Sequence, residues 1–157
     1  MNLFPCRCAL VTLALMLPAS GAWAHAYAPE GLHIHHPWSR ATVPGATVAA
    51  AYLLVRNRGT LPERLLGAST PVAARIEMHD NVKEGDVYRM REFKSLELPS
   101  AGTVEFLPSG RHFMLVGLKR PLKEGERIPM VLRFERAGKV KVEIEVESAG
   151  SKGDTHH

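Results

Sequence analysis

Two stretches near the C-terminus alternate strictly between apolar and polar residues, and this alternation restricts the fold more than any other feature. In Lys139–Glu147 every second residue is Val or Ile, and the residues between them are charged. The stretch 127–135 also places an apolar residue at every second position. A period of two residues puts one set of side chains on one face of a β-strand. We therefore predict two strands whose inward residues are Ile128, Met130, Leu132, Phe134, Val140, Val142, Ile144 and Val146.

The preceding part of the chain carries further short apolar runs rich in β-branched and aromatic residues. Turn signals rich in Gly, Pro, Ser and Asn separate these runs, and no long helical pattern occurs in the sequence. Many short strands at nearly regular spacing are typical of an all-β sandwich, with Trp38, Tyr52 and Leu54 as further core candidates. The predicted strands are 48–56, 64–69, 73–79, 87–93, 103–107 and 112–118.

The first 24 residues have the features of a secretory signal peptide. Arg7 is followed by an apolar run from 9 to 17, and a small-x-small site ends at Ala24. Cleavage there removes Cys6 and Cys8, the two cysteines of the chain. No typical lipobox precedes Cys8, which argues against a lipoprotein. We predict a signal peptide (1–24), one domain (25–150) and a polar tail (151–157), exported to the periplasm.

Composition and motifs exclude several classes of function. The 157 residues suffice for one domain after processing. The formal net charge of +4 is mild, and no basic stripe with interleaved aromatic residues indicates nucleic-acid binding. The mature chain would have no cysteine, and no G-x-S-x-G motif indicates a serine hydrolase. These absences argue against a hydrolase, and the candidate metal-binding residues described below favour a binding protein that is not an enzyme.

Four residues in the middle of the chain form a candidate metal-binding set: His79, Met90, His112 and Met114. Thioether sulfur is a soft ligand, and imidazole suits copper and zinc. Two thioethers with two imidazoles therefore indicate copper, and Cu(I) in particular. Met78 and Met130 are expected to fill the core instead.

Strand geometry predicts that these four residues cluster. A turn over 83–86, centred on Glu84 and Gly85, would place His79 directly opposite Met90 in a hairpin. His112 and Met114 are two residues apart and would share one strand face. Glu77 would share the face of His79, where it is a candidate to orient the metal-bound imidazole. An exposed carboxylate without that role is the alternative.

This pattern resembles the periplasmic copper chaperones of the PCuAC type, whose signature is H(M)-x10-M-x21-H-x-M. His79, Met90, His112 and Met114 match it position for position. Further similarity lies at 37–41 (PWSRA), 44–45 (PG), 49–52 (AAAY) and 117–118 (GL), so the resemblance covers most of the chain after the leader.

The resemblance implies a cupredoxin-like Greek-key β-sandwich or barrel that binds one Cu(I). It also implies delivery of copper within the periplasm, and we expect the protein to be a monomer. The implied acceptor is the CuA site of cytochrome c oxidase subunit II, or a Sco-type assembly protein.

Further histidines lie near both ends of the mature chain. They are either incidental residues of solvated termini or ligands of a weaker second Cu(II) site. An N-terminal His25, with His33, His35 or His36, would also permit a histidine brace as in copper monooxygenases, and a metal-free adhesive sandwich is a further alternative. The residues concerned are His25, His33, His35, His36, His156 and His157.

Overall fold

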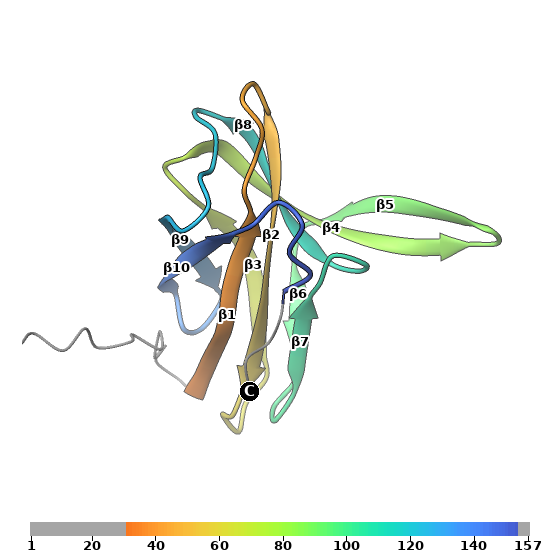
Figure 1. Cartoon of the computed structure of the whole chain (residues 1–157). Coiled ribbons are helices and arrows are strands. Elements are labelled where there is room, and N and C mark those ends of the chain that lie inside the picture. The colour runs from red at the N-terminus through yellow and green to blue at the C-terminus, as the bar shows by residue number, and fades with distance from the viewer. Residues whose placement is uncertain (1–30, 154–157) are drawn as a thin grey trace, which may run out of the picture.

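A computed structural model describes residues 31–153 of the chain, and every regular element assigned there is a β-strand (Figure 1). No helix in this part of the chain is long and apolar enough to cross a membrane. The strands are β1 (Leu32–Arg40), β2 (Val48–Asn57), β3 (Glu63–Ser69), β4 (Ala73–Glu84), β5 (Val87–Phe93), β6 (Leu96–Leu98), β7 (Thr103–Phe106), β8 (His112–Leu118), β9 (Arg127–Phe134) and β10 (Lys139–Glu147).

All ten strands belong to one hydrogen-bonded sheet. Its order is β5-β4-β8-β2-β1-β10-β9-β3-β6, and β7 pairs with the second half of β2. β1 and β10 are parallel, whereas the other neighbours are antiparallel. The inward residues of nearly all strands meet in one hydrophobic cluster, because the sheet curves over on itself. The predicted all-β, cupredoxin-like fold is confirmed.

The alternating strands β9 and β10 supply much of this core. All eight of their predicted inward residues are buried, Met130 among them, and Met78 of β4 is buried as well. Phe106 and Phe113 stack at the centre, with ring centroids 4.2 Å apart. Burial of such side chains stabilises the fold by about 1.5–3 kcal/mol each relative to exposure.

Trp38, Tyr52 and Leu54 were the further core candidates, and the first two are buried but lie outside this cluster. Trp38 and Tyr52 are in ring contact, with centroids 4.6 Å apart, and the Arg40 guanidinium lies 5.7 Å from the Trp38 ring. Gly153 packs directly against the Trp38 ring: a Cβ on this glycine would lie 2.4 Å from Cζ2 of Trp38. The start of the predicted polar tail therefore packs on the domain. Leu54, the third predicted core residue, is only partly buried.

The β4–β5 hairpin projects away from the rest of the molecule (Figure 1). β4 continues to Glu84, so the loop consists of Gly85 and Asp86 alone. Gly85 has a φ of 62°, as a two-residue hairpin loop with Gly at its first position requires.

This short loop corrects the predicted register of the hairpin. His79 pairs with Glu92, and Met90 pairs with Asn81. The prediction that His79 lies directly opposite Met90 is therefore wrong, because the loop is centred one residue later than expected. The partner of His79 moves by two residues, which preserves the strand face. His79 and Met90 consequently remain on the same face as diagonal neighbours.

Candidate metal site

The candidate site lies where β4 leaves the body of the protein and enters the hairpin. β4 pairs with β8 up to His79, which lies directly opposite His112. The two imidazole rings are edge-on to each other, with centroids 5.8 Å apart. The same ladder pairs Glu77 with Met114. These four residues therefore occupy two adjacent rows on one face of the sheet.

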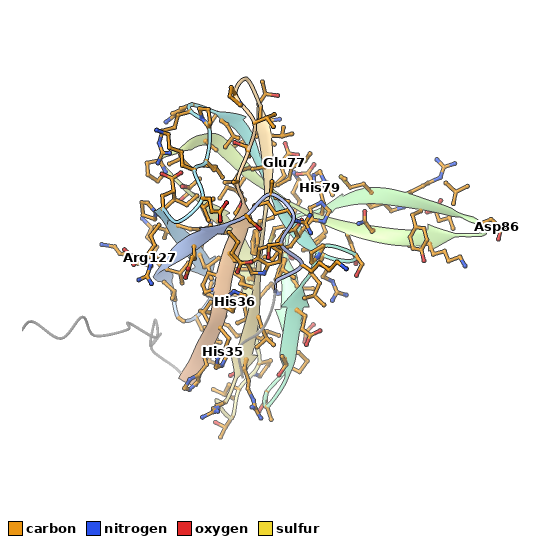
Figure 2. The ribbon with its side chains drawn as sticks, in the orientation of Figure 1. His35, His36, Glu77, His79, Asp86 and Arg127 are labelled. Carbon is orange, nitrogen blue, oxygen red and sulfur yellow. The ribbon has the colours of Figure 1, made fainter. Side chains whose placement is uncertain are left out.

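His79 is buried and held by a charged neighbour. Its exposed fraction is 9%. Its Nε2 lies 3.0 Å from Oε2 of Glu77, and the other carboxylate oxygen, Oε1, accepts a 2.7 Å hydrogen bond from Nε of Arg75. Figure 2 shows Glu77 and His79 at the base of the hairpin, far from Asp86 at its tip. Glu77 thus contacts the His79 imidazole, as its candidate role of orienting that ring requires.

The other ring nitrogen of His79 has a different environment. Nδ1 is buried and has no hydrogen-bond partner among the described residues. A buried polar atom without a partner costs about 1–3 kcal/mol, so such atoms are rare in folded proteins. A metal ion bound by the Nδ1 lone pair would remove this cost.

His112 is also buried, with an exposed fraction of 6%. Its Nδ1 lies 3.0 Å from the carbonyl oxygen of Gly110, in the loop before β8. A carbonyl only accepts hydrogen bonds, so Nδ1 carries the proton and Nε2 keeps its lone pair. His112 therefore also has one ring nitrogen available as a metal ligand.

The two thioethers lie on either side of the histidine pair. Met114 is two residues from His112, on the same strand face, and is partly buried. Met90 lies on β5, diagonally across from His79, and 53% of it is exposed. All four predicted residues thus share one face, with Met90 at the solvent side.

The donor set fits a soft metal ion better than a hard one. Among residues 31–153 no group of three or more His, Cys, Asp or Glu side chains is arranged to hold a metal ion. An arrangement of two imidazoles and two thioethers has too few of these groups to form such a cluster. The chemistry of the four side chains therefore favours Cu(I) over Zn²⁺ or Ca²⁺.

Glu77 carries its negative charge next to this donor set. Its pKa is lowered, mainly by the hydrogen bond from Arg75; desolvation opposes this effect, and the contact with His79 adds to it. An ionised Glu77 only accepts hydrogen bonds. The His79 nitrogen that faces it therefore carries a proton.

The remaining predicted histidines do not join this cluster. His33 and His35 stack on β1 with ring centroids 6.2 Å apart, whereas Nε2 of His36 lies 2.7 Å from Oε1 of Glu147. A β-bulge between His35 and Trp38, with a φ of 44° at His36, separates His36 from the other two. Figure 2 shows His35 and His36 on β1, away from Glu77 and His79. His25, His156 and His157 lie outside the described residues.

Sequence reasoning missed two contributors to the site. Arg75 holds Glu77, and the Gly110 carbonyl fixes the His112 ring. The first had a detectable signal, because Arg75, Glu77 and His79 alternate along one face of β4. The second depends on the shape of the loop before β8 and leaves no side-chain pattern.

A family model described as "Putative lipoprotein LpqE-like" matches residues 32–146. The protein named "Putative lipoprotein Lxx21020" from Leifsonia xyli subsp. xyli (strain CTCB07) is 30% identical over 148 residues, which cover 94% of this chain and 87% of that protein. The family match thus spans the whole sandwich and all four candidate ligands.

Two solved structures have a similar fold. The copper-bound PCuAC domain from PmoF2 is 31% identical, with a TM-score of 0.69, over 80% of this chain and 99% of that domain. The Cu(I) form of DR1885 from Deinococcus radiodurans is 30% identical, with a TM-score of 0.60, over 85% of this chain and 87% of that protein. The resemblance to the PCuAC type that the sequence indicated is confirmed. The chain therefore belongs to the LpqE-like family and has the fold of PCuAC domains.

Proposed function

We propose that this protein is a copper chaperone that binds one Cu(I) ion through His79, His112, Met90 and Met114. The observation that carries the proposal is the buried His79–His112 pair, in which each ring keeps one lone pair after its other nitrogen is hydrogen-bonded. The copper-bound state of two similar structures supports the same metal for this chain.

The ligand set suits a d10 ion that must be both held and released. Two nitrogens and two sulfurs provide a distorted tetrahedron of neutral ligands for Cu(I). The histidines are buried at the base of the hairpin, whereas Met90 lies on the exposed strand β5. An acceptor can therefore displace Met90 first and the more deeply placed ligands afterwards. Copper is the cargo of this exchange, and no catalytic turnover is needed.

The compartment and acceptor follow from the leader and from the resemblance. The signal-peptide pattern of residues 1–24 favours export, and the lipoprotein names of the family and its relative support a location in the cell envelope. We propose the periplasm as the compartment. The proposed acceptor is the CuA site of cytochrome c oxidase subunit II or a Sco-type protein, with the chaperone acting as a monomer.

An anaerobic titration of residues 25–157 with Cu(I), followed by metal analysis, tests the binding step. We expect one tightly bound Cu(I) per chain. His79→Ala and His112→Ala should each weaken binding. Acidification should weaken it in the parent, because a protonated imidazole cannot ligate. Unchanged Cu(I) binding in both histidine variants would contradict the proposal.

His25→Ala separates this proposal from the histidine brace, which requires the N-terminal histidine. We expect this variant to bind Cu(I) like the parent. Loss of all copper binding in it would favour the brace.

A transfer assay tests the acceptor. The Cu(I)-loaded protein is mixed with a metal-free CuA domain or a Sco-type protein, and copper in each is measured after separation. Copper should move to one of these acceptors, and retention by the chaperone with both would contradict the proposed delivery.

A further inference from the structure

We infer that Arg75 and Glu77 are positioning residues that fix the His79 ring, so that the metal binds Nδ1 of His79 but Nε2 of His112. This inference rests on the proposed copper site and adds which nitrogen of each histidine is the ligand. It also gives a role to Arg75, a residue outside the metal-binding motif.

The Arg75–Glu77–His79 contacts form a chain along one face of β4. Arg75 donates to Oε1 of Glu77 at 2.7 Å, which leaves Oε2 to face Nε2 of His79 at 3.0 Å. The carboxylate is therefore held from both sides and cannot rotate without losing one contact. Hydrogen bonds between charged partners are stronger than neutral ones, so the arrangement restricts the imidazole.

These contacts assign the proton on each ring. Glu77 accepts from Arg75 through Oε1 and presents Oε2 to His79, so Nε2 of His79 carries the proton and the buried Nδ1 has the lone pair. The Gly110 carbonyl imposes the opposite tautomer on His112, whose lone pair is on Nε2. The two histidines thus offer different nitrogens from adjacent strands. Metal-bound histidines commonly donate their second ring nitrogen to a carboxylate or a backbone carbonyl, and here one histidine uses each.

The hairpin provides a matched control for Glu77. Glu92 lies directly opposite His79 on β5 and is on the same face. Its carboxylate forms an ion pair with Lys94. Glu92→Ala therefore removes a neighbouring carboxylate without removing the contact to Nε2. A general electrostatic effect of a nearby negative charge would appear in both variants, whereas a positioning effect would appear only in Glu77→Ala.

Long-range 1H–15N spectra of the histidine rings in the metal-free protein test the assignment without copper. At a pH where both rings are neutral, we expect the Nε2–H tautomer for His79 and the Nδ1–H tautomer for His112. On addition of Cu(I), which is diamagnetic, the 15N shift of Nδ1 should change most in His79, and that of Nε2 in His112. The same nitrogen shifting in both rings would overturn the inference.

Variants then test the positioning role. Glu77→Ala should mix the tautomers of His79 and lower Cu(I) affinity about 10–100-fold. Arg75→Ala should do the same to a smaller extent. Glu77→Gln offers one oxygen to two donors: Arg75 takes it, so the amide NH2 faces Nε2 and should favour the opposite, Nδ1–H tautomer of His79. A folding defect in the alanine variant would not produce this reversal. Glu92→Ala should change neither quantity.

The outcomes separate this inference from the proposed function. Normal Cu(I) binding in the parent, with equal effects of Glu77→Ala and Glu92→Ala, would overturn the positioning role and leave the chaperone proposal intact. A parent that binds no Cu(I) would overturn both.

Discussion

The body of the sandwich and the β4–β5 hairpin differ in how deeply their side chains are buried. β9 and β10 bury every second residue in a shared core, whereas six of the seven residues of β5 are exposed. Val87, Tyr88 and Met90 are large apolar side chains that the hairpin leaves in solvent. The candidate ligands lie at the boundary, with His79 and His112 on the buried side and Met90 on the exposed side. We thus assign stability to the buried body of the sheet and the proposed metal exchange to its boundary with the exposed hairpin.

The largest expected contrast is between a core residue and a hairpin residue. Ile144→Ala removes a fully buried side chain and should lower the free energy of unfolding by about 2–5 kcal/mol. Tyr88→Ala removes a side chain that is 67% exposed and should change it by no more than about 0.5 kcal/mol. Urea unfolding of the metal-free variants measures both. Similar losses in the two variants would remove the distinction between body and hairpin.

A smaller effect is expected at the hairpin loop. Gly85 has a φ of 62°, and a Cβ on it would meet no atom within 4 Å. The cost of Gly85→Ala is therefore conformational, about 1 kcal/mol. Amide hydrogen exchange should accelerate in the outer half of the hairpin and stay unchanged in β9 and β10.

Gly110→Ala is the control for the loop variant. A Cβ there also meets open space, and its backbone φ is not positive. We expect little change in exchange. Faster exchange throughout the protein in Gly85→Ala would show that the hairpin is coupled to the core.

The smallest expected effect is an exposed ion pair on the body. Arg120 donates to both oxygens of Glu126, at 2.8 and 2.9 Å, and this contact is the main cause of the lowered pKa of Glu126. Because the folded pKa lies below the ordinary value, the stabilisation is present above the unfolded pKa of about 4.5 and is lost as pH falls through the folded pKa. Glu126→Gln should cost about 0.5 kcal/mol or less at pH 7, because the pair is solvent-screened.

Unfolding measurements at pH 7 and pH 3 check this sign. The difference in unfolding free energy between the parent and Glu126→Gln should shrink at pH 3. A difference that grows as the pH falls would contradict the assigned cause of the pKa shift.

The alternation of the sequence predicts most of the fold because one face of each strand must be buried. All eight inward residues of β9 and β10 were predictable in this way. β1 and β6 are absent from the predicted strands. The bulge at His36 interrupts the alternation of β1, and β6 has only three residues, too few to show a period. Trp38 and Tyr52 were predicted as core residues, but the packing of Gly153 on the Trp38 ring was not, because no local pattern reveals it.

The candidate site was predictable in its residues but not in its register. The spacing of the four candidate ligands defines the set, and the two-residue period of the strands places them on one face. The pairing of His79 with Glu92 follows from a loop centred between Gly85 and Asp86 and not between Glu84 and Gly85. All of these residues, and Lys83 before them, are plausible turn residues. The turn signal alone therefore does not locate the centre of the hairpin.

We expect sulfur at the boundary between the body and the hairpin to determine Cu(I) binding. Anaerobic Cu(I) competition titration of Met90→Leu/Met114→Leu tests it most directly. Leu keeps the volume and removes the sulfur, so the fold should survive with at most about 1.5 kcal/mol lost. We predict poor Cu(I) binding in this double variant and normal binding in Met78→Leu and Met130→Leu, whose methionines are buried in the core. Normal Cu(I) binding in Met90→Leu/Met114→Leu, or equal losses in the core controls, would contradict it.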